Sequence, residues 1–227
     1  MRSPASHSRL TRGVVHVVKL GGSLARSPEL ARWLSVVTES GAGRAVLVPG
    51  GGPFADAVRV AQRRQPFDDA SAHRMALLAM EQYGLMLTGM QSALVAADSS
   101  AAIARILASG GVPVWMPCTM VLACPEIPAT WDVSSDSLAA WLAAQLGAAL
   151  LVLVKSVSVR SAESRVAADE LAERGWVDPL FSAYAAAAGC AIRLLGSDDQ
   201  ARLRRMLASG VPEGLEVAVQ TAPASGD

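Results

Sequence analysis

The chain has 227 residues, of which 52% are hydrophobic and 18% charged, and its basic and acidic side chains balance. A zero net charge argues against a nucleic-acid partner, because binding a phosphate backbone needs a basic excess. No apolar run approaches the roughly 20 residues that would span a bilayer, so no membrane partner is expected and one sizeable α/β core is favoured.

The two ends differ in composition from the rest of the chain. Residues 1–13 are polar and basic and lack the apolar region of a secretory signal, while residues 220–227 are small and polar. We expect a disordered leader at 1–13, a single domain over 14–219 and a disordered tail at 220–227, in a cytoplasmic protein.

Three cysteines, Cys118, Cys124 and Cys190, are odd in number and have no C-x-x-C spacing. This argues against a disulfide framework and against a zinc site, so we expect buried free thiols and no protein-bound metal.

Strand-like apolar runs alternate with helix-like segments. The predicted strands are Val14–Leu20, Ala45–Pro49, Val112–Pro117, Leu150–Val154, Ala191–Leu195 and Leu215–Val219. The predicted helices are Glu29–Ser40, Phe54–Arg63, Ala72–Leu87, Ser99–Ala108, Asp136–Leu146, Asp178–Ala188 and Gln200–Leu207. Because several strands are apolar throughout, both faces should be covered, which is typical of a mostly parallel sheet between helical layers. Functional groups of such sheets gather at the carboxyl ends of the strands.

Two strand ends carry glycine runs. The first strand ends in Lys19 and is followed by Gly21 and Gly22, and the second is followed by Gly50–Gly52 and Pro53. Glycine lets backbone N–H groups approach an anion, and the lysine adds a full charge. A tight turn explains the first pair equally well, but three consecutive glycines favour an anion nest.

Two further strand or helix ends carry charge. Ser135 and Asp136 open a predicted helix, where either could simply cap it or Asp136 could orient a lysine in the ligand crevice. Lys155 follows an apolar strand, where it is either a solvated strand end or a second charge for phosphoryl transfer. His73, at another helix start, is favoured as a cap or packing residue over a substrate contact.

Together these motifs resemble the amino acid kinase family over about Val14 to Leu195. Within the family they are most similar to the methanofuran-biosynthesis branch, which phosphorylates aminomethylfuranmethyl phosphate to the diphosphate. The resemblance implies a three-layer αβα sandwich with an open, mainly parallel sheet of about eight strands. It also implies ATP as cofactor, Mg²⁺ carried by the nucleotide, a small-molecule phosphate as substrate, and assembly as a homodimer or higher oligomer.

The resemblance also implies roles for single residues. Lys19, Asp136 and Lys155 would be catalytic, with Asp136 organising the lysines. The nucleotide phosphates would be bound by Lys19, Gly21, Gly22, Ser23 and Lys155. The acceptor would be bound by Gly50, Gly51, Gly52, Asp56 and Ser135.

One segment departs from the family pattern. After the strand that precedes Lys155, the family has an acidic residue and a glycine in a D-G-(V/I)-Y run, followed by a segment that holds adenine. Here residues 156–162 contain no glycine. This departure leaves open a non-catalytic nucleotide- or oxyanion-binding protein, of the molybdate-storage or regulatory-subunit type, beside the leading hypothesis of a kinase.

Overall fold

The computed structural model describes residues 14–157 and 163–219. The predicted leader and tail therefore lie outside the described residues. The strands are β1 (His16–Leu20), β2 (Ala45–Pro49), β3 (Leu94–Ala97), β4 (Val112–Trp115), β5 (Leu150–Val154), β6 (Arg165–Ala167), β7 (Ala191–Leu195) and β8 (Leu215–Ala218).

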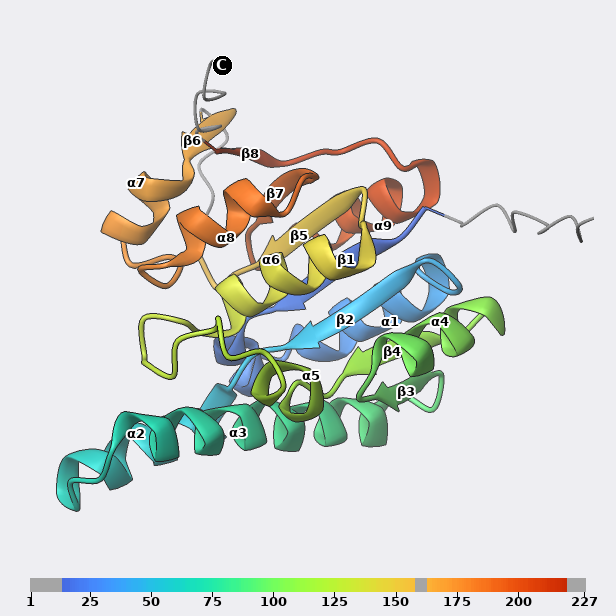
Figure 1. Ribbon diagram of the computed structural model, residues 1–227. Coiled ribbons are helices and arrows are strands. Elements are labelled where there is room, and N and C mark those ends of the chain that lie inside the picture. Colours follow the sequence, from blue (N-terminus) through green and yellow to red (C-terminus); the bar gives the residue numbers. More distant parts are fainter. Residues whose placement is uncertain (1–13, 158–162, 220–227) are drawn as a thin grey trace, which may run out of the picture.

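The helices connect the strands on both faces of the sheet (Figure 1). They are a 3₁₀ helix, η1 (Gly22–Arg26), and the α-helices α1 (Leu30–Ser40), α2 (Gly52–Arg64), α3 (Asp69–Met90), α4 (Ser100–Ala108), α5 (Cys118–Leu122), α6 (Ser135–Leu146), α7 (Ala168–Glu173), α8 (Phe181–Ala187) and α9 (Gln200–Ser209).

The described strands form one eight-stranded sheet in the order β3-β4-β2-β1-β5-β7-β8-β6. Every neighbouring pair runs parallel except β7 and β8. The predicted mainly parallel sheet of about eight strands is confirmed, but the apolar pattern located only six of them. It missed β3, whose two central residues are exposed, and β6, which has three residues. Neither strand gives a long apolar run.

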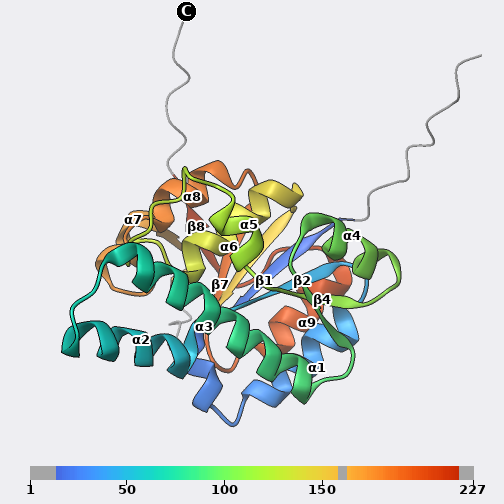
Figure 2. The ribbon, with the colours of Figure 1, turned by 60° about the horizontal axis from the view of Figure 1, so that its bottom comes forward.

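Helices cover the sheet on both faces, which confirms the predicted three layers (Figures 1 and 2). One core cluster joins α6 and α8 to one face, and a second joins α1 and α9 to the other. The long helix α3 contributes to both, through Leu77 and Met80 on one side and Tyr83 and Leu87 on the other. Helix α2 packs along α3 and reaches η1.

Two other expectations concern the whole chain. The three cysteines are free, as expected, but each is half-buried and none is fully enclosed. Cys118 begins the short helix α5 and Cys124 follows it, and both pack at the margin of the core while staying partly exposed, so the prediction of buried thiols is wrong. Within the described residues, no helix has both the length and the apolarity that crossing a membrane requires.

The loops that follow β1 and β2 pack backbone against backbone. The two strands pair in parallel with Leu20 opposite Pro49, so both loops leave from the same edge. A Cβ atom on Gly22 would lie 2.3 Å from the nitrogen of Gly52, and one on Gly50 would lie 2.4 Å from the nitrogen of Gly22. The fold itself therefore requires glycine at positions 22 and 50, whatever the loops bind.

This contact predicts that Gly22→Ala lowers the free energy of unfolding by about 2 kcal/mol or more, because the backbone of the facing loop must move. Gly89→Ala is the matched control. It lies exposed on α3 with no atom within 4 Å of an added Cβ, so the change should be neutral or slightly stabilising. Urea unfolding followed by circular dichroism compares them, and equal midpoints would contradict the packing argument.

Candidate active site

The carboxyl ends of β1 and β5 bring two lysines to the same face of the sheet. Side chains alternate along a strand, and Lys19 shares its side of β1 with Val17, which belongs to the core beneath α6. Lys155 follows β5 directly and keeps the alternation of Leu151 and Leu153, which face the same core. Strand periodicity alone therefore directs both ammonium groups toward the start of α6.

Asp136, in the first turn of α6, lies between the two ammonium groups. Lys19 Nζ is 2.8 Å from Oδ1, and Lys155 Nζ donates a hydrogen bond to Oδ2 at 2.6 Å. Each carboxylate oxygen thus contacts one ammonium group. Lys19 and Asp136 are buried, whereas 13% of the Lys155 side chain is exposed.

Burial and charge act in opposite directions on this cluster. The pKa of Lys19 is lowered to about 8. Burial is the main cause and the charge of Lys155 adds to it, while Asp136 acts in the opposite direction. Burial also raises the pKa of Asp136, but the charges of Lys155 and Lys19 outweigh it and hold that pKa below its usual value. Near neutral pH the cluster therefore holds two ammonium groups against one carboxylate, an excess of one positive charge. An excess positive charge in a low-dielectric site attracts anions strongly.

A distant aspartate caps α6. Asp178, in the segment before α8, accepts hydrogen bonds from Ser134 N at 3.0 Å, Ser134 Oγ at 2.8 Å and Ser137 N at 3.1 Å, and also from Ser137 Oγ. The alternative that Ser135 or Asp136 caps this helix is therefore wrong. Asp178 accepts hydrogen bonds from backbone N–H groups at the start of α6, so Asp136 is not needed as a helix cap. Its carboxylate can therefore contact the two lysines.

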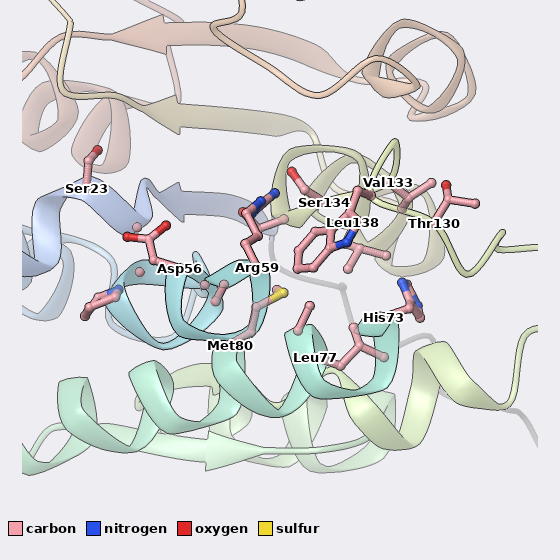
Figure 3. Close-up of a pocket in the computed structure, with 18 of the residues that line it drawn as sticks. Ser23, Asp56, Arg59, His73, Leu77, Met80, Thr130, Val133, Ser134 and Leu138 are labelled. Atoms are coloured by element: carbon pink, nitrogen blue, oxygen red, sulfur yellow. The ribbon is translucent and has the colours of Figure 1, made fainter. Parts of the chain in front are cut away.

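A cavity of about 340 Å³ opens beside this cluster, between the two glycine loops, α2, α3 and the start of α6 (Figure 3). It is lined by Gly22, Ser23, Arg26, Gly51, Gly52, Pro53, Ala55, Asp56, Arg59, His73, Ala76, Leu77, Met80, Thr130, Trp131, Val133, Ser134, Ser135 and Leu138. The wall is apolar at Leu77 and Met80 of α3 and at Leu138 of α6, and polar side chains line both ends of the cavity, among them Ser23 and Asp56 at one end and His73 and Thr130 at the other (Figure 3). A concave site that combines an apolar wall with polar groups is typical of small-molecule sites.

The predicted site residues fall into two groups. Those that line the cavity are Gly22, Ser23, Gly51, Gly52, Asp56 and Ser135. Lys19, Asp136 and Lys155 form the buried cluster next to it, and Gly21 and Gly50 are buried beneath the loops. The chain thus brings all of these residues to one edge of the sheet, while their individual roles stay predictions.

The loops after β1 and β5 also meet. Ser23 Oγ and Ser156 Oγ lie 2.8 Å apart in a hydrogen bond, and Gly21 N donates to Val154 O at 2.9 Å. Ser156 begins the segment that departs from the family pattern. Residues 158–162 of that segment lie outside the described residues, so the prediction about its adenine pocket is untested.

His73 lies at the far end of the cavity from Ser23 (Figure 3). Burial lowers its pKa, against the effect of a hydrogen bond to the backbone of Thr130. The imidazole is therefore neutral near pH 7.

Sequence reasoning missed several site residues. Asp178 gives no local signal, because its acceptor role depends on a helix some 40 positions earlier. Arg59 could have been found, since residues four and seven positions after Gly52 share its face of a helix, and that face turns toward the glycine loops.

Solved structures of similar fold include uridylate kinase from Archaeoglobus fulgidus, with a TM-score of 0.68 and 15% sequence identity over 90% of this chain and all of that one. Isopentenyl phosphate kinase gives a TM-score of 0.57 and 16% identity, again over 90% of this chain and all of the other. At these identities the likeness concerns the fold alone.

A curated relative is [5-(aminomethyl)furan-3-yl]methyl phosphate kinase of Methanocaldococcus jannaschii. It is 24% identical over 144 residues, which are 63% of this chain and 66% of that protein. The model of the amino acid kinase family matches residues 15–174, more than two thirds of the chain. The protein therefore belongs to the amino acid kinase family.

Proposed function

We propose that the protein is a kinase that transfers the γ-phosphoryl group of ATP to a phosphate-monoester acceptor. The acceptor we infer is aminomethylfuranmethyl phosphate, converted to its diphosphate in methanofuran-type cofactor biosynthesis in the cytoplasm. The observation that carries the proposal is the buried Lys19–Asp136–Lys155 cluster beside a cavity walled by two glycine loops. The relative at 24% identity supports the choice of acceptor.

The residues present fit a nucleotide phosphate chain. Two ammonium groups supply positive charge, and Gly22, Gly51 and Gly52 expose backbone on the cavity side of the two loops, where phosphate oxygens could approach it. Bound Mg-ATP would supply the transferable phosphoryl group. Within the described residues no three His, Cys, Asp or Glu side chains gather to hold a metal, so Mg²⁺ would arrive on the nucleotide.

In this mechanism the chain contributes charge and position. Lys19 and Lys155 neutralise the charge on the transferring group, and Asp136 fixes both ammonium groups, so little reorganisation is needed during transfer. The acceptor phosphate is already ionised at neutral pH, so no general base is required. His73, the one histidine of the cavity lining, lies at the opposite end of the cavity from Ser23 in the first glycine loop (Figure 3).

The cavity suits a compact acceptor with one polar end. Its volume of about 340 Å³ accommodates a small ring. The glycine loops and Ser135 would bind the phosphate nearest the lysines, and Leu77, Met80 and Leu138 would contact the ring. The acceptor oxygen would then face the cluster directly.

A non-catalytic nucleotide- or oxyanion-binding role is the second candidate, favoured by the altered sequence after Lys155. Purified protein separates the two. Mg-ATP consumption that depends on a phosphate-monoester acceptor supports the kinase, whereas tight Mg-ATP or oxyanion binding with no turnover on any such acceptor supports the alternative.

We also propose a second copy of the chain as partner. Large apolar side chains are exposed along α3 and the neighbouring edge strand β3, at Met75, Leu78, Leu85, Met90 and Val95. Exposed large apolar side chains on a helix and on a neighbouring edge strand are what a homo-oligomer would cover.

Asp136→Asn should lower turnover by about two orders of magnitude, because the neutral amide no longer holds the two ammonium groups in place. The free energy of unfolding should fall only moderately, because Lys19 can become neutral by releasing its proton. No unpaired charge then stays buried. Steady-state kinetics and thermal unfolding measure the two effects. Wild-type turnover in this variant would remove Asp136 from the mechanism.

The pKa of Lys19 predicts a pH dependence. Below pH about 8 the ammonium form predominates, and above it the charge is lost, so kcat/KM for Mg-ATP should fall as pH rises through about 8. Lys155→Arg, which keeps its charge, should retain this decrease, because the titrating group is Lys19. A kcat/KM that stays constant to pH 9.5 would contradict a charged Lys19 in catalysis.

A further inference from the structure

Arg59 is a half-buried cation whose donors are not used by the fold. It lies on α2 and lines the cavity (Figure 3). Its guanidinium carbon is 4.0 Å from the ring centre of Trp131. Burial lowers the pKa of Arg59, and neighbouring Arg63 acts in the same direction, while exposed Asp56 only partly offsets them. Among the described residues, no carboxylate or carbonyl accepts a hydrogen bond from it.

The stack with Trp131 fixes where those donors point. A guanidinium lying over an indole face keeps its N–H groups in its own plane, free for the two-pronged contact that arginine makes with phosphate. A lysine at this position would carry the same charge but would lack the planar group that makes two parallel hydrogen bonds to a phosphate.

Trp131 is itself held in place from α2. Its Nε1 donates to Gln62 Oε1 at 2.7 Å, and the amide nitrogen of Gln62 donates to Phe67 O at 3.1 Å and Asp69 Oδ1 at 2.9 Å. The oxygen and the nitrogen of the Gln62 amide are thereby both bonded, so the indole is oriented before any ligand binds. Such preorganisation lowers the entropy cost of binding.

The position of Arg59 on α2 directs it toward the glycine loops. Gly52 begins the helix, and Asp56 and Arg59 follow at four and seven positions, on one face. Long side chains of a helix lean toward its N-terminus. Arg59 lines the same cavity as Gly52 and Pro53 in the N-terminal turn of α2, where the helix dipole also favours an anion.

From these contacts we infer that Arg59 binds the phosphate of the acceptor and that Trp131 positions it. The inference rests on the proposed function, in which a phosphate monoester occupies this cavity. The acceptor phosphate would then contact the guanidinium of Arg59 as well as the glycine loops. The lysine cluster would bind the nucleotide instead.

The test is calorimetric binding of benzyl phosphate, a ring-bearing phosphate monoester, to the full chain. Arg59→Gln should weaken its binding by about ten-fold or more, the loss typical of a charge-assisted contact, and leave Mg-ADP binding unchanged. Arg63→Gln is the matched control. It removes the same charge from an exposed neighbour on the same helix, outside the cavity lining, and should change binding less than two-fold by screening alone.

A second pair of variants tests the positioning role of Trp131. Trp131→Phe keeps an aromatic face for the guanidinium and should retain most of the affinity for benzyl phosphate, whereas Trp131→Ala should lose several-fold. Equal loss in both variants would mean that the ring does not position Arg59.

The outcomes also separate this inference from the proposed function. Equal binding of benzyl phosphate by Arg59→Gln and Arg63→Gln, or no binding by the wild-type protein at millimolar concentration, overturns the role of Arg59. If benzyl phosphate binding depends on Arg59 but the protein has no kinase activity, the phosphate site is supported and the proposed kinase function is contradicted.

Discussion

A single buried carboxylate between two ammonium groups is the interaction on which the site depends. Neither lysine could stay charged so near the other in a low-dielectric interior without Asp136, and Asp136 could not stay ionised there without them. The arrangement leaves an excess of one positive charge, which a bound anion would neutralise. The rest of the fold serves this arrangement: two parallel strands deliver the lysines, and α6 delivers the carboxylate.

Two other constraints support that arrangement. Asp178 occupies the cap of α6, so that Asp136 is not needed there. The glycine loops approach each other so closely that no side chain fits between them at Gly22 or Gly50. Gly22 and Ser135 line the cavity, and Ser135 directly precedes Asp136 of the buried cluster. Under the proposed function, a change at Asp136 should affect the chemistry and a change at Arg59 should affect acceptor binding.

Much of this could be predicted from the sequence, because the informative residues stand at strand ends. Uninterrupted apolar strands predicted a parallel sheet, and parallel strands place Lys19, Lys155 and both glycine runs at one edge. What could not be predicted depended on residues distant in the chain. The cap of α6 comes from Asp178, the closeness of Gly22 to Gly52 depends on strand register, and β3 and β6 exist only because neighbouring strands pair with them. The alternative readings of Asp136 were equally compatible with local sequence, and tertiary contact alone separated them.

The central claim is that Lys19 and Lys155 contact the phosphoryl group that is transferred. The most direct measurement is the ratio of dissociation constants for Mg-ADP and for the magnesium complex of a non-hydrolysable ATP analogue, in the wild-type protein and in Lys19→Met. Only the analogue carries the third phosphate. We predict that the wild-type protein binds it about ten-fold more tightly than Mg-ADP, through charge-assisted contacts, and that Lys19→Met abolishes this preference. An unchanged ratio in the variant would contradict the account.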